Sequence, residues 1–217
     1  MNWQKYTHVL WDFNGTVYDD VEACRRSVNS MLAERRLPTL SLSQYREVFD
    51  FPVKDYYARV GFDFDREPFE VLAPLWVAEY ERESLLCGVY DGVREAMAAI
   101  RARGLRQEIL SATEEKMLAR QLAALGIDKE VDGFWGMRTI HAAGKESLAI
   151  SWREAHPDAR VLFIGDTTHD AHVAAVMKAD CLLFEGGHMS RRRLDACGCP
   201  IIAGFDELIG YTDGERA

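Results

Sequence analysis

Acidic, hydroxyl-bearing and cationic residues follow apolar runs or begin helical patterns at several places in this sequence. These residues are Asp12, Ser111, Lys145, Asp166 and Asp170. Phosphoryl transfer requires a nucleophile, charge-neutralising cations and donors to the phosphoryl oxygens, and these residue types supply such groups. The carboxylates of Asp12 and Asp166 also suit Mg²⁺, which prefers oxygen ligands. The residue types therefore predict metal-assisted chemistry on a phosphate group.

Each of these residues has a plainer explanation when it is taken alone. A strand-end aspartate before Gly and Thr is often a helix cap, and Ser111 can cap the helix after it. A lysine such as Lys145 is usually exposed to solvent. Asp166 and Asp170 could be helix caps or turn residues. Their order along the chain, each at a strand end or loop, favours one shared site over five unrelated roles.

The surrounding pattern predicts the elements that would bring these residues together. Apolar runs predict strands ending at Asp12 and lying near 106–110, 160–164 and 181–184. Apolar residues at helical spacing predict helices near 93–104, 118–126, 145–155 and 170–178. Such alternation indicates right-handed βαβ units and a parallel sheet, in which ligands bind beyond the carboxyl ends of the strands.

The block from about 17 to 86 has a different, entirely helical pattern. One apolar stripe, which stops before Pro38, contains Val17, Val21, Cys24, Val28 and Met31. A second, which Pro74 must kink or start, contains Phe69, Leu72, Trp76 and Tyr80. No strand is expected here, so the block is predicted to form a cap over the carboxyl edge of the sheet.

Composition limits the class of protein. The 217 residues suit one large domain or a core with a smaller insert. The net charge of −9 argues against a nucleic-acid partner, since phosphate neutralisation needs clustered Lys and Arg. No run approaches the ~20 apolar residues of a membrane span, and no signal-peptide pattern is present. Five cysteines without a Cys-x-x-Cys pair favour free thiols in a reducing, cytoplasmic compartment. The sequence carries no signal for an oligomeric state.

The segment Asp12-Phe13-Asn14-Gly15-Thr16-Val17 resembles the nucleophile motif of the haloacid dehalogenase superfamily, and the later residues follow the order of its other motifs. The helical block resembles the cap of the subgroup similar to phosphoglycolate phosphatase. This resemblance implies an α/β fold with a doubly wound, parallel, Rossmann-like sheet. Its core would comprise 1–16 and 88–217, and its α-helical cap would comprise 17–87.

The resemblance also implies roles for individual residues. Asp12 would be the nucleophile that forms an aspartyl-phosphate, and Lys145 would neutralise charge. Mg²⁺ would be held by Asp12, the Asn14 backbone carbonyl, Asp166 and, less directly, Asp170. The expected phosphate-binding residues are Gly15, Thr16, Ser111, Ala112 and Lys145. The implied activity is hydrolysis of small phosphorylated metabolites, such as phosphoglycolate-like monoesters.

Asn14 departs from the family pattern. Phosphatase relatives carry an aspartate there, which protonates the leaving oxygen and then activates water. An amide cannot exchange a proton in this way, although it can still donate a hydrogen bond. Three alternatives remain: a slow phosphatase, a phosphatase with another base, for which His188 and His169 are candidates, and an inactive phosphate-ester-binding or regulatory protein. The halide-removing and phosphonate-cleaving relatives, with Tyr or Ala at this position, match less well.

Substrate choice is expected to depend on the cap. The segment 51–57 falls where relatives carry a loop that faces the site. Lys54 or Arg59 would bind a substrate carboxylate, and Tyr56 or Tyr57 would shape the pocket. The tyrosines are equally consistent with the cap's own core. His169 and His172 invite a zinc hypothesis, although an exposed helix face also explains their spacing.

Overall fold

Six parallel strands form one sheet in the computed structural model, which describes residues 1–137 and 144–210. The strands are β1 (His8–Trp11), β2 (Arg106–Glu114), β3 (Gly133–Met137), β4 (Val161–Gly165), β5 (Asp180–Phe184) and β6 (Ile201–Ile202). Their order across the sheet is β3-β2-β1-β4-β5-β6. The chain moves outward from β1 in both directions, which confirms the predicted doubly wound α/β core.

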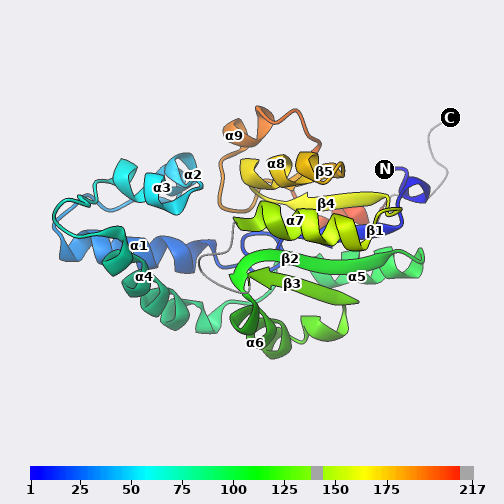
Figure 1. The fold of residues 1–217 in the computed structure, drawn as a ribbon, viewed down its shortest axis with the longest axis horizontal. Coiled ribbons are helices and arrows are strands. Elements are labelled where there is room, and N and C mark those ends of the chain that lie inside the picture. Colours follow the sequence, from blue (N-terminus) through cyan, green and yellow to red (C-terminus); the bar gives the residue numbers. More distant parts are fainter. Residues whose placement is uncertain (138–143, 211–217) are drawn as a thin grey trace.

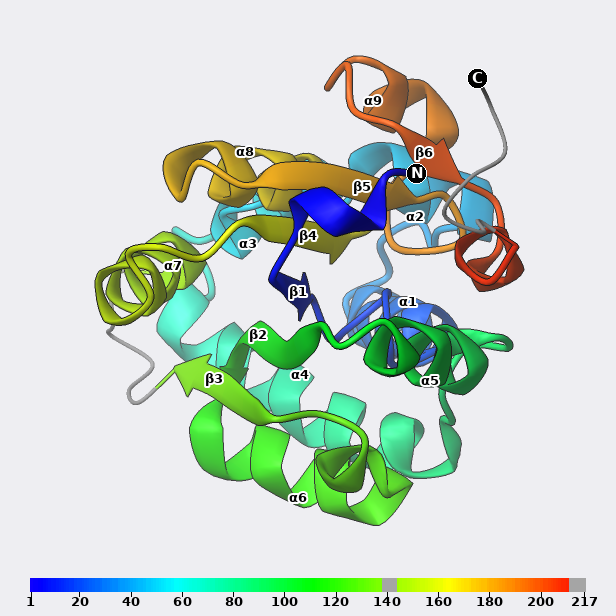
Figure 2. The same cartoon turned by 90° about the vertical axis from the view of Figure 1, so that its right-hand side faces the viewer.

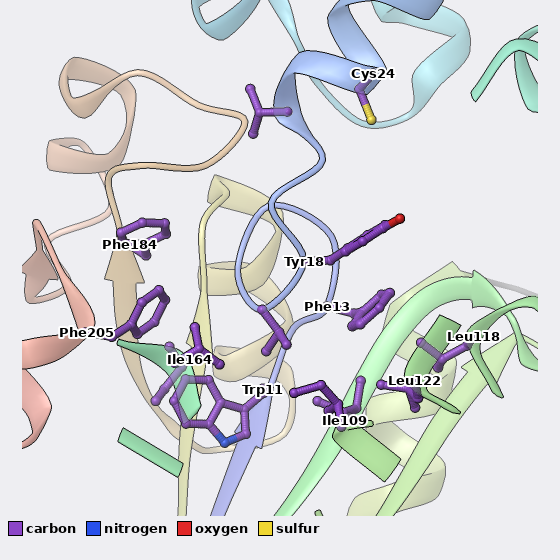
Figure 3. Close-up of a cluster of buried hydrophobic side chains, with 14 of the residues drawn as sticks. Trp11, Phe13, Tyr18, Cys24, Ile109, Leu118, Leu122, Ile164, Phe184 and Phe205 are labelled. Carbon is purple, nitrogen blue, oxygen red and sulfur yellow. The ribbon is translucent and has the colours of Figure 1, made fainter. Parts of the chain in front are cut away.

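Helices cover both faces of this sheet (Figure 2). They are α5 (Val93–Ala102), α6 (Glu115–Leu125), α7 (Gly144–Ala155) and α8 (Thr168–Val176), while the short α9 (Arg191–Asp195) lies near β6. Side chains alternate between the faces along β1, as expected for a strand. Trp11 therefore lies on one face, with its ring toward Phe205 and Ile164 (Figure 3), whereas Leu10 belongs to the cluster on the other face, which contains Trp152 of α7.

Four α-helices and a 3₁₀ turn lie between β1 and α5 in the sequence, and we call this segment the helical insert. They are α1 (Val21–Glu34), α2 (Leu42–Val48), α3 (Val53–Val60), α4 (Phe69–Glu83) and η2 (Ser84–Leu86). Figure 1 shows the insert extending to one side of the sheet, with α1 and α4 packed together. Pro74 lies inside α4 on its exposed side. The predicted all-helical block is thus confirmed within this segment.

The sheet differs from the predicted pattern in three places. β3 and β6 are not among the predicted strands; β3 is short and contains two glycines, and β6 has only two residues. β2 continues to Glu114 instead of ending near Leu110, with a register shift between those residues. Ser111 therefore lies within this irregular strand and not after it. Among the described residues, no helix is long and apolar enough to cross a membrane.

Candidate active site

Asp12 and Asp166 follow neighbouring strands at the point where the strand order reverses. β1 pairs with β4, with Trp11 opposite Ile164, and the Asp12 N–H donates to the Ile164 carbonyl over 2.8 Å. Open α/β sheets bind ligands at such a switch point, beyond the carboxyl ends of the strands. Both carboxylates are buried, at 7% exposure for Asp12 and 0% for Asp166. The topology therefore brings the two predicted acids to one location.

The Lys145 side chain bridges Asp12, at the end of β1, and Asp170, just after β4. Lys145 is the second residue of α7, and its buried ammonium contacts Asp12 Oδ1 and lies 2.5 Å from Asp170 Oδ1. Burial opposes the charge on this ammonium, but the two carboxylates hold the pKa of Lys145 above its ordinary value. Lys145 is therefore a fixed cation beside the candidate nucleophile.

Asp170 is held by hydrogen bonds on both of its carboxylate oxygens. Oδ1 accepts from Lys145, and Oδ2 accepts from the N–H groups of Asp166 and Thr167 and from the Thr167 hydroxyl. The pairing of Thr167 and Asp170 forms a capping box at the start of α8. These contacts favour a role in orienting Lys145 over the metal-ligand role expected from the sequence.

A hydroxyl donor and a backbone N–H donor bind the Asp166 carboxylate, and glycine backbone lies close to it. Its Oδ1 accepts from the Thr16 hydroxyl over 3.0 Å, and its Oδ2 accepts from the His188 N–H over 2.6 Å. A Cβ on Gly187 would lie 2.2 Å from Asp166 Oδ2, and one on Gly15 would lie 2.5 Å from it. Glycine is therefore needed at both positions for the backbone to approach this carboxylate.

The donor set at this edge suits Mg²⁺. Carboxylate oxygens of Asp12, Asp166 and Asp170 lie within 4.8 Å of one another, and all three residues are buried. Burial, with the Asp170 carboxylate nearby, raises the pKa of Asp166 to about 6 against the opposing effect of His188. The Asn14 backbone carbonyl accepts no hydrogen bond from the described residues. Mg²⁺ takes such oxygen ligands, whereas the other two candidate metal clusters in the described chain contain His or Cys.

The Asn14 side chain is oriented by three hydrogen bonds. Its Nδ2 donates to Asp20 Oδ2 over 2.7 Å and to the Tyr80 hydroxyl over 2.8 Å. Its Oδ1 accepts from the Thr113 hydroxyl over 2.7 Å. Both amide hydrogens are thus engaged, so the expected hydrogen bond from Asn14 to a leaving oxygen has no free donor in this arrangement.

His188 lines the same cavity, but protein groups face both of its ring nitrogens. Nδ1 shares a 2.8 Å hydrogen bond with the Tyr45 hydroxyl, and Nε2 lies 3.5 Å from Asp20 Oδ1. Burial opposes the imidazolium, but Asp20 raises the pKa of His188 above its ordinary value. The ring therefore pairs with Asp20, which leaves neither nitrogen free to serve as the substitute base considered from the sequence.

The predicted phosphate-binding residues divide into two groups. Ser111 and Ala112 line the cavity beside Asp12 and Lys145. The Gly15 N–H, in contrast, already donates to the Tyr18 carbonyl and to Asp20 Oδ1, and the Thr16 hydroxyl donates to Asp166. Gly15 and Thr16 therefore shape the turn in this structure instead of presenting these donors to a phosphate.

A cavity of about 450 Å³ joins the strand ends to the helical insert. Tyr56 and Tyr57 are buried in its wall and also belong to the hydrophobic core, so both of their expected roles fit this structure. Lys54 and Arg59 are not among its lining residues: the Lys54 ammonium lies over the Phe64 ring, 5.5 Å from its centroid, and Arg59 bonds to the Val48 carbonyl and Asp50. The structure therefore does not bring the two predicted carboxylate-binding cations to the site.

The zinc hypothesis also lacks support in the described chain. His169 lines the cavity and packs on Phe51, with ring centroids 5.0 Å apart. His172 is exposed and pairs instead with Glu146 over 3.2 Å. Neither histidine belongs to a group of ligating side chains close enough to hold a metal among the described residues.

Sequence reasoning missed the carboxylate behind the first turn. Asp20 is fully buried at the N-cap of α1, yet its side chain makes no cap hydrogen bond and instead accepts from Gly15, Asn14 and Tyr80. Hydrogen bonds from His188, Tyr80 and Asn14 outweigh burial and keep its pKa below the ordinary value. The available signal was the pair Asp19-Asp20, six residues after an amide that stands where an acid is expected.

A family model described as haloacid dehalogenase-like hydrolase matches residues 9–184, which include Asp12, Lys145 and Asp166. The chain belongs to the haloacid dehalogenase-like hydrolase family. The predicted family is thus confirmed, and Asp12, Lys145 and Asp166 occupy the strand-end and helix-start positions that the resemblance implied.

The proteins that this chain resembles in sequence or in fold carry different names. A phosphoglycolate phosphatase from Xanthomonas campestris is 29% identical over 152 residues, which cover 69% of this chain and 63% of that protein. The matched part of this chain thus spans less than two thirds of that relative. A family hydrolase from Streptococcus pneumoniae superposes with a TM-score of 0.82 at 16% identity, covering 96% of this chain and 99% of that one. Protein tyrosine kinase A from Mycobacterium tuberculosis superposes with a TM-score of 0.78 at 20% identity, covering 95% and 99%.

Proposed function

We propose that this protein is a Mg²⁺-dependent phosphatase that hydrolyses small phosphate monoesters through an aspartyl-phosphate on Asp12. The observation that carries this proposal is the meeting of Asp12, Lys145 and Asp166 on the floor of a cavity large enough for a small metabolite. The names of the phosphoglycolate phosphatase relatives support the same reaction class.

In the first step, Asp12 attacks phosphorus while the ester oxygen leaves. Oδ1 of Asp12 is bound by Lys145, and among the described residues Oδ2 has only a 3.4 Å contact with the Thr16 hydroxyl. Oδ2 is therefore the oxygen that forms the bond to phosphorus, as the bond from phosphorus to the ester oxygen breaks. Lys145 offsets the negative charge that accumulates during transfer. Ser111 lines the cavity beside these groups, and its hydroxyl, which donates to the Thr113 hydroxyl over 3.1 Å, would turn from Thr113 to orient a phosphoryl oxygen.

In the second step, water attacks phosphorus, and the bond from phosphorus to Asp12 breaks. Inorganic phosphate leaves, the Asp12 carboxylate is restored, and the water must lose a proton to a base. Asp12, Asp166 and the Asn14 carbonyl would hold Mg²⁺, which would neutralise phosphate charge when bound. Asn14 cannot accept the proton, so we expect this second step to be slow.

The principal alternative is a phosphate-ester-binding or regulatory protein without turnover. The engaged amide of Asn14 is the observation that favours it. An assay of phosphate release from a panel of phosphate esters with Mg²⁺ separates the two functions. The phosphatase predicts release that disappears in Asp12→Asn. Ester binding by the wild-type protein without any release of phosphate would support the alternative.

We also propose that the helical insert acts as a cap. Its α2 helix contacts the loop after β5 through Arg46, which donates to the carbonyls of Gly186 and Gly187 over 2.5 and 2.9 Å. Aromatic residues of the insert form much of the cavity wall. A closed insert would exclude bulk water from the reacting phosphate.

A further inference from the structure

The cavity above Asp12 has a polar floor and largely apolar walls. The floor carries Asp12, Lys145 and Ser111 from the core. The walls come mainly from the helical insert, with Phe49, Tyr56, Tyr57, Trp76, Val77 and, from α6, Met117. A volume of about 450 Å³ lies within the range of about 300–1,000 Å³ typical of small-molecule sites. A phosphate seated on the floor would therefore direct the rest of its ester against aromatic and aliphatic surface.

The buried cations of this cavity are already committed to carboxylates. Lys145 contacts Asp12 and Asp170, and the His188 ring faces Asp20. Arg120 also lines the cavity, but it is exposed, and the acidic residues Glu81 and Glu114 line the cavity with it. The two buried cations are thus balanced by acidic side chains, whereas Arg120 is open to solvent.

Three cations of the insert are engaged away from the cavity wall. Arg46 is bonded to backbone carbonyls of the loop after β5, Arg59 is bonded to Asp50, and Lys54 lies on Phe64. A carboxylate on a substrate that packs against the apolar wall of the insert would therefore meet none of these cations there. Burying an unpaired charge in such surroundings is costly.

Asn14 restricts the leaving group independently of the walls. Its amide hydrogens are engaged by Asp20 and Tyr80, so it supplies neither a proton nor a free donor to the departing oxygen. An aliphatic alcohol is about as weak an acid as water, whose pKa is about 15.7, and its anion leaves poorly without protonation. A phenol, with a pKa of about 10, departs as its anion far more readily.

We propose that the site selects aryl phosphate monoesters whose ring carries no further negative charge, a substrate class that rests on the proposed phosphatase function. The aromatic ring would pack against the walls of the insert, and the phosphate would meet Asp12 and Lys145. Attack by Asp12 would transfer the phosphoryl group and release a phenolate, which would take its proton from solvent. The two requirements, an apolar ring and a weakly basic leaving oxygen, are met by one class of ester.

The test compares kcat/KM for four esters with saturating Mg²⁺: phenyl phosphate, benzyl phosphate, 3-carboxyphenyl phosphate and 2-phosphoglycolate. Phenyl and benzyl phosphate share a ring and differ in the basicity of the leaving oxygen. Phenyl and 3-carboxyphenyl phosphate have leaving oxygens of similar basicity and differ in charge. We expect kcat/KM for phenyl phosphate to exceed that for each of the other three esters by about tenfold or more. Each of the other esters either binds less well in the transition state or has a less stable leaving group.

Two variants locate the charge discrimination. Val77 lies in the wall and is 42% exposed, so Val77→Lys can add a cation there without burying it fully. This variant should raise kcat/KM for 3-carboxyphenyl phosphate relative to phenyl phosphate by about tenfold. Lys54→Ala, outside the cavity, should leave that ratio unchanged. Because the ratio is measured within one preparation, it does not depend on how much of a variant is folded.

The outcomes separate this inference from the function on which it rests. Turnover of 2-phosphoglycolate or 3-carboxyphenyl phosphate at or above the rate of phenyl phosphate would overturn it. Loss of that preference in Arg120→Ala would then identify Arg120 as the cation that binds the carboxylate. Equal rates for phenyl and benzyl phosphate would refute the leaving-group requirement. No release of phosphate from any of the four esters would refute the proposed phosphatase itself, and the substrate class with it.

Discussion

The Asn14 amide donates a 2.7 Å hydrogen bond to the buried carboxylate of Asp20. Asn14 stands where the resemblance to the family's phosphatases leads us to expect an acid, and the Asp20 carboxylate lies directly behind it. Asp20 is fully buried and is further held by Tyr80 and by the facing ring of His188. The acidic group is thus present within the first turn, but it is directed away from the cavity floor.

This pair predicts that exchanging the two side chains changes the reaction more than replacing one of them. Asn14→Asp alone would place a second carboxylate beside Asp20, and repulsion would make the two share a proton. The double variant Asn14→Asp/Asp20→Asn keeps one amide and one carboxylate and moves the acid toward the cavity. We expect it to speed the slow release step by roughly 10²–10⁴-fold.

Rapid-mixing kinetics with phenyl phosphate measure this release step. The double variant should also reduce the difference between phenyl and benzyl phosphate, since an acid at position 14 can protonate an alkoxide. If neither variant changes the rate of release, another group already performs the proton transfer. Equal acceleration by the single and double variants would show that Asp20 does not oppose an acid at position 14.

Metal removal provides the second prediction. Chelation should abolish phosphate release, and added Mg²⁺ should restore it, because Asp12 and Asp166 carry more negative charge than Lys145 balances. A readout without turnover is the midpoint of thermal unfolding, which Mg²⁺ should raise in the wild-type protein by mass action. Asp166→Asn should lose this increase. Full activity of a metal-free preparation would rule out the proposed cofactor.

Gly187 gives the third prediction. A Cβ at this position would lie 2.2 Å from Asp166 Oδ2, so Gly187→Ala must displace the carboxylate or the loop that carries His188. We expect a loss of about 1–3 kcal/mol in the free energy of unfolding and a large loss of activity. Gly88→Ala is the matched control, since a Cβ there meets nothing within 4 Å. Similar stability and activity for both variants would contradict the close approach.

Two buried tyrosines give the fourth prediction. The Tyr56 hydroxyl is buried without a hydrogen-bond partner in the described structure, whereas the Tyr45 hydroxyl shares a hydrogen bond with His188 Nδ1. Tyr56→Phe should leave the free energy of unfolding unchanged or raise it by up to about 1 kcal/mol, and Tyr45→Phe should lower it by about 1–3 kcal/mol. Urea unfolding measures both. Equal losses would mean that the Tyr56 hydroxyl has a partner after all.

The hydrophobic pattern of the sequence is sufficient to predict the strands of the core, but it predicts the residues that face the cavity less well. Apolar runs that end in Asp12 and Asp166 predict parallel strands, and parallel strands necessarily bring their carboxyl ends to one edge. Ser111 was placed at a strand end because the apolar run stops at Leu110, but backbone pairing continues through an irregular segment to Glu114. Backbone pairing of this irregular segment depends on the neighbouring strand, so the local hydrophobic pattern does not predict it.

The specificity residues illustrate a different limit. Lys54 was a reasonable carboxylate ligand from its position in the insert, yet whether it faces the cavity depends on how α3 packs, and its ammonium lies over Phe64. The partnership of Asn14 with Asp20 depends on the turn between them, and Tyr80 joins it from sixty residues away. Tertiary packing decides these contacts, so local pattern alone does not reveal them.

Rapid-quench mass spectrometry of the peptide containing Asp12 shows whether this carboxylate becomes phosphorylated during turnover. With phenyl phosphate and Mg²⁺, we expect a burst of phenol, a transient phosphoryl group on Asp12, and slow release of phosphate because Asn14 cannot activate water. Asp12→Asn should show neither the burst nor the modification. Steady phosphate release by correctly folded Asp12→Asn at a rate near that of the wild-type protein would contradict the account.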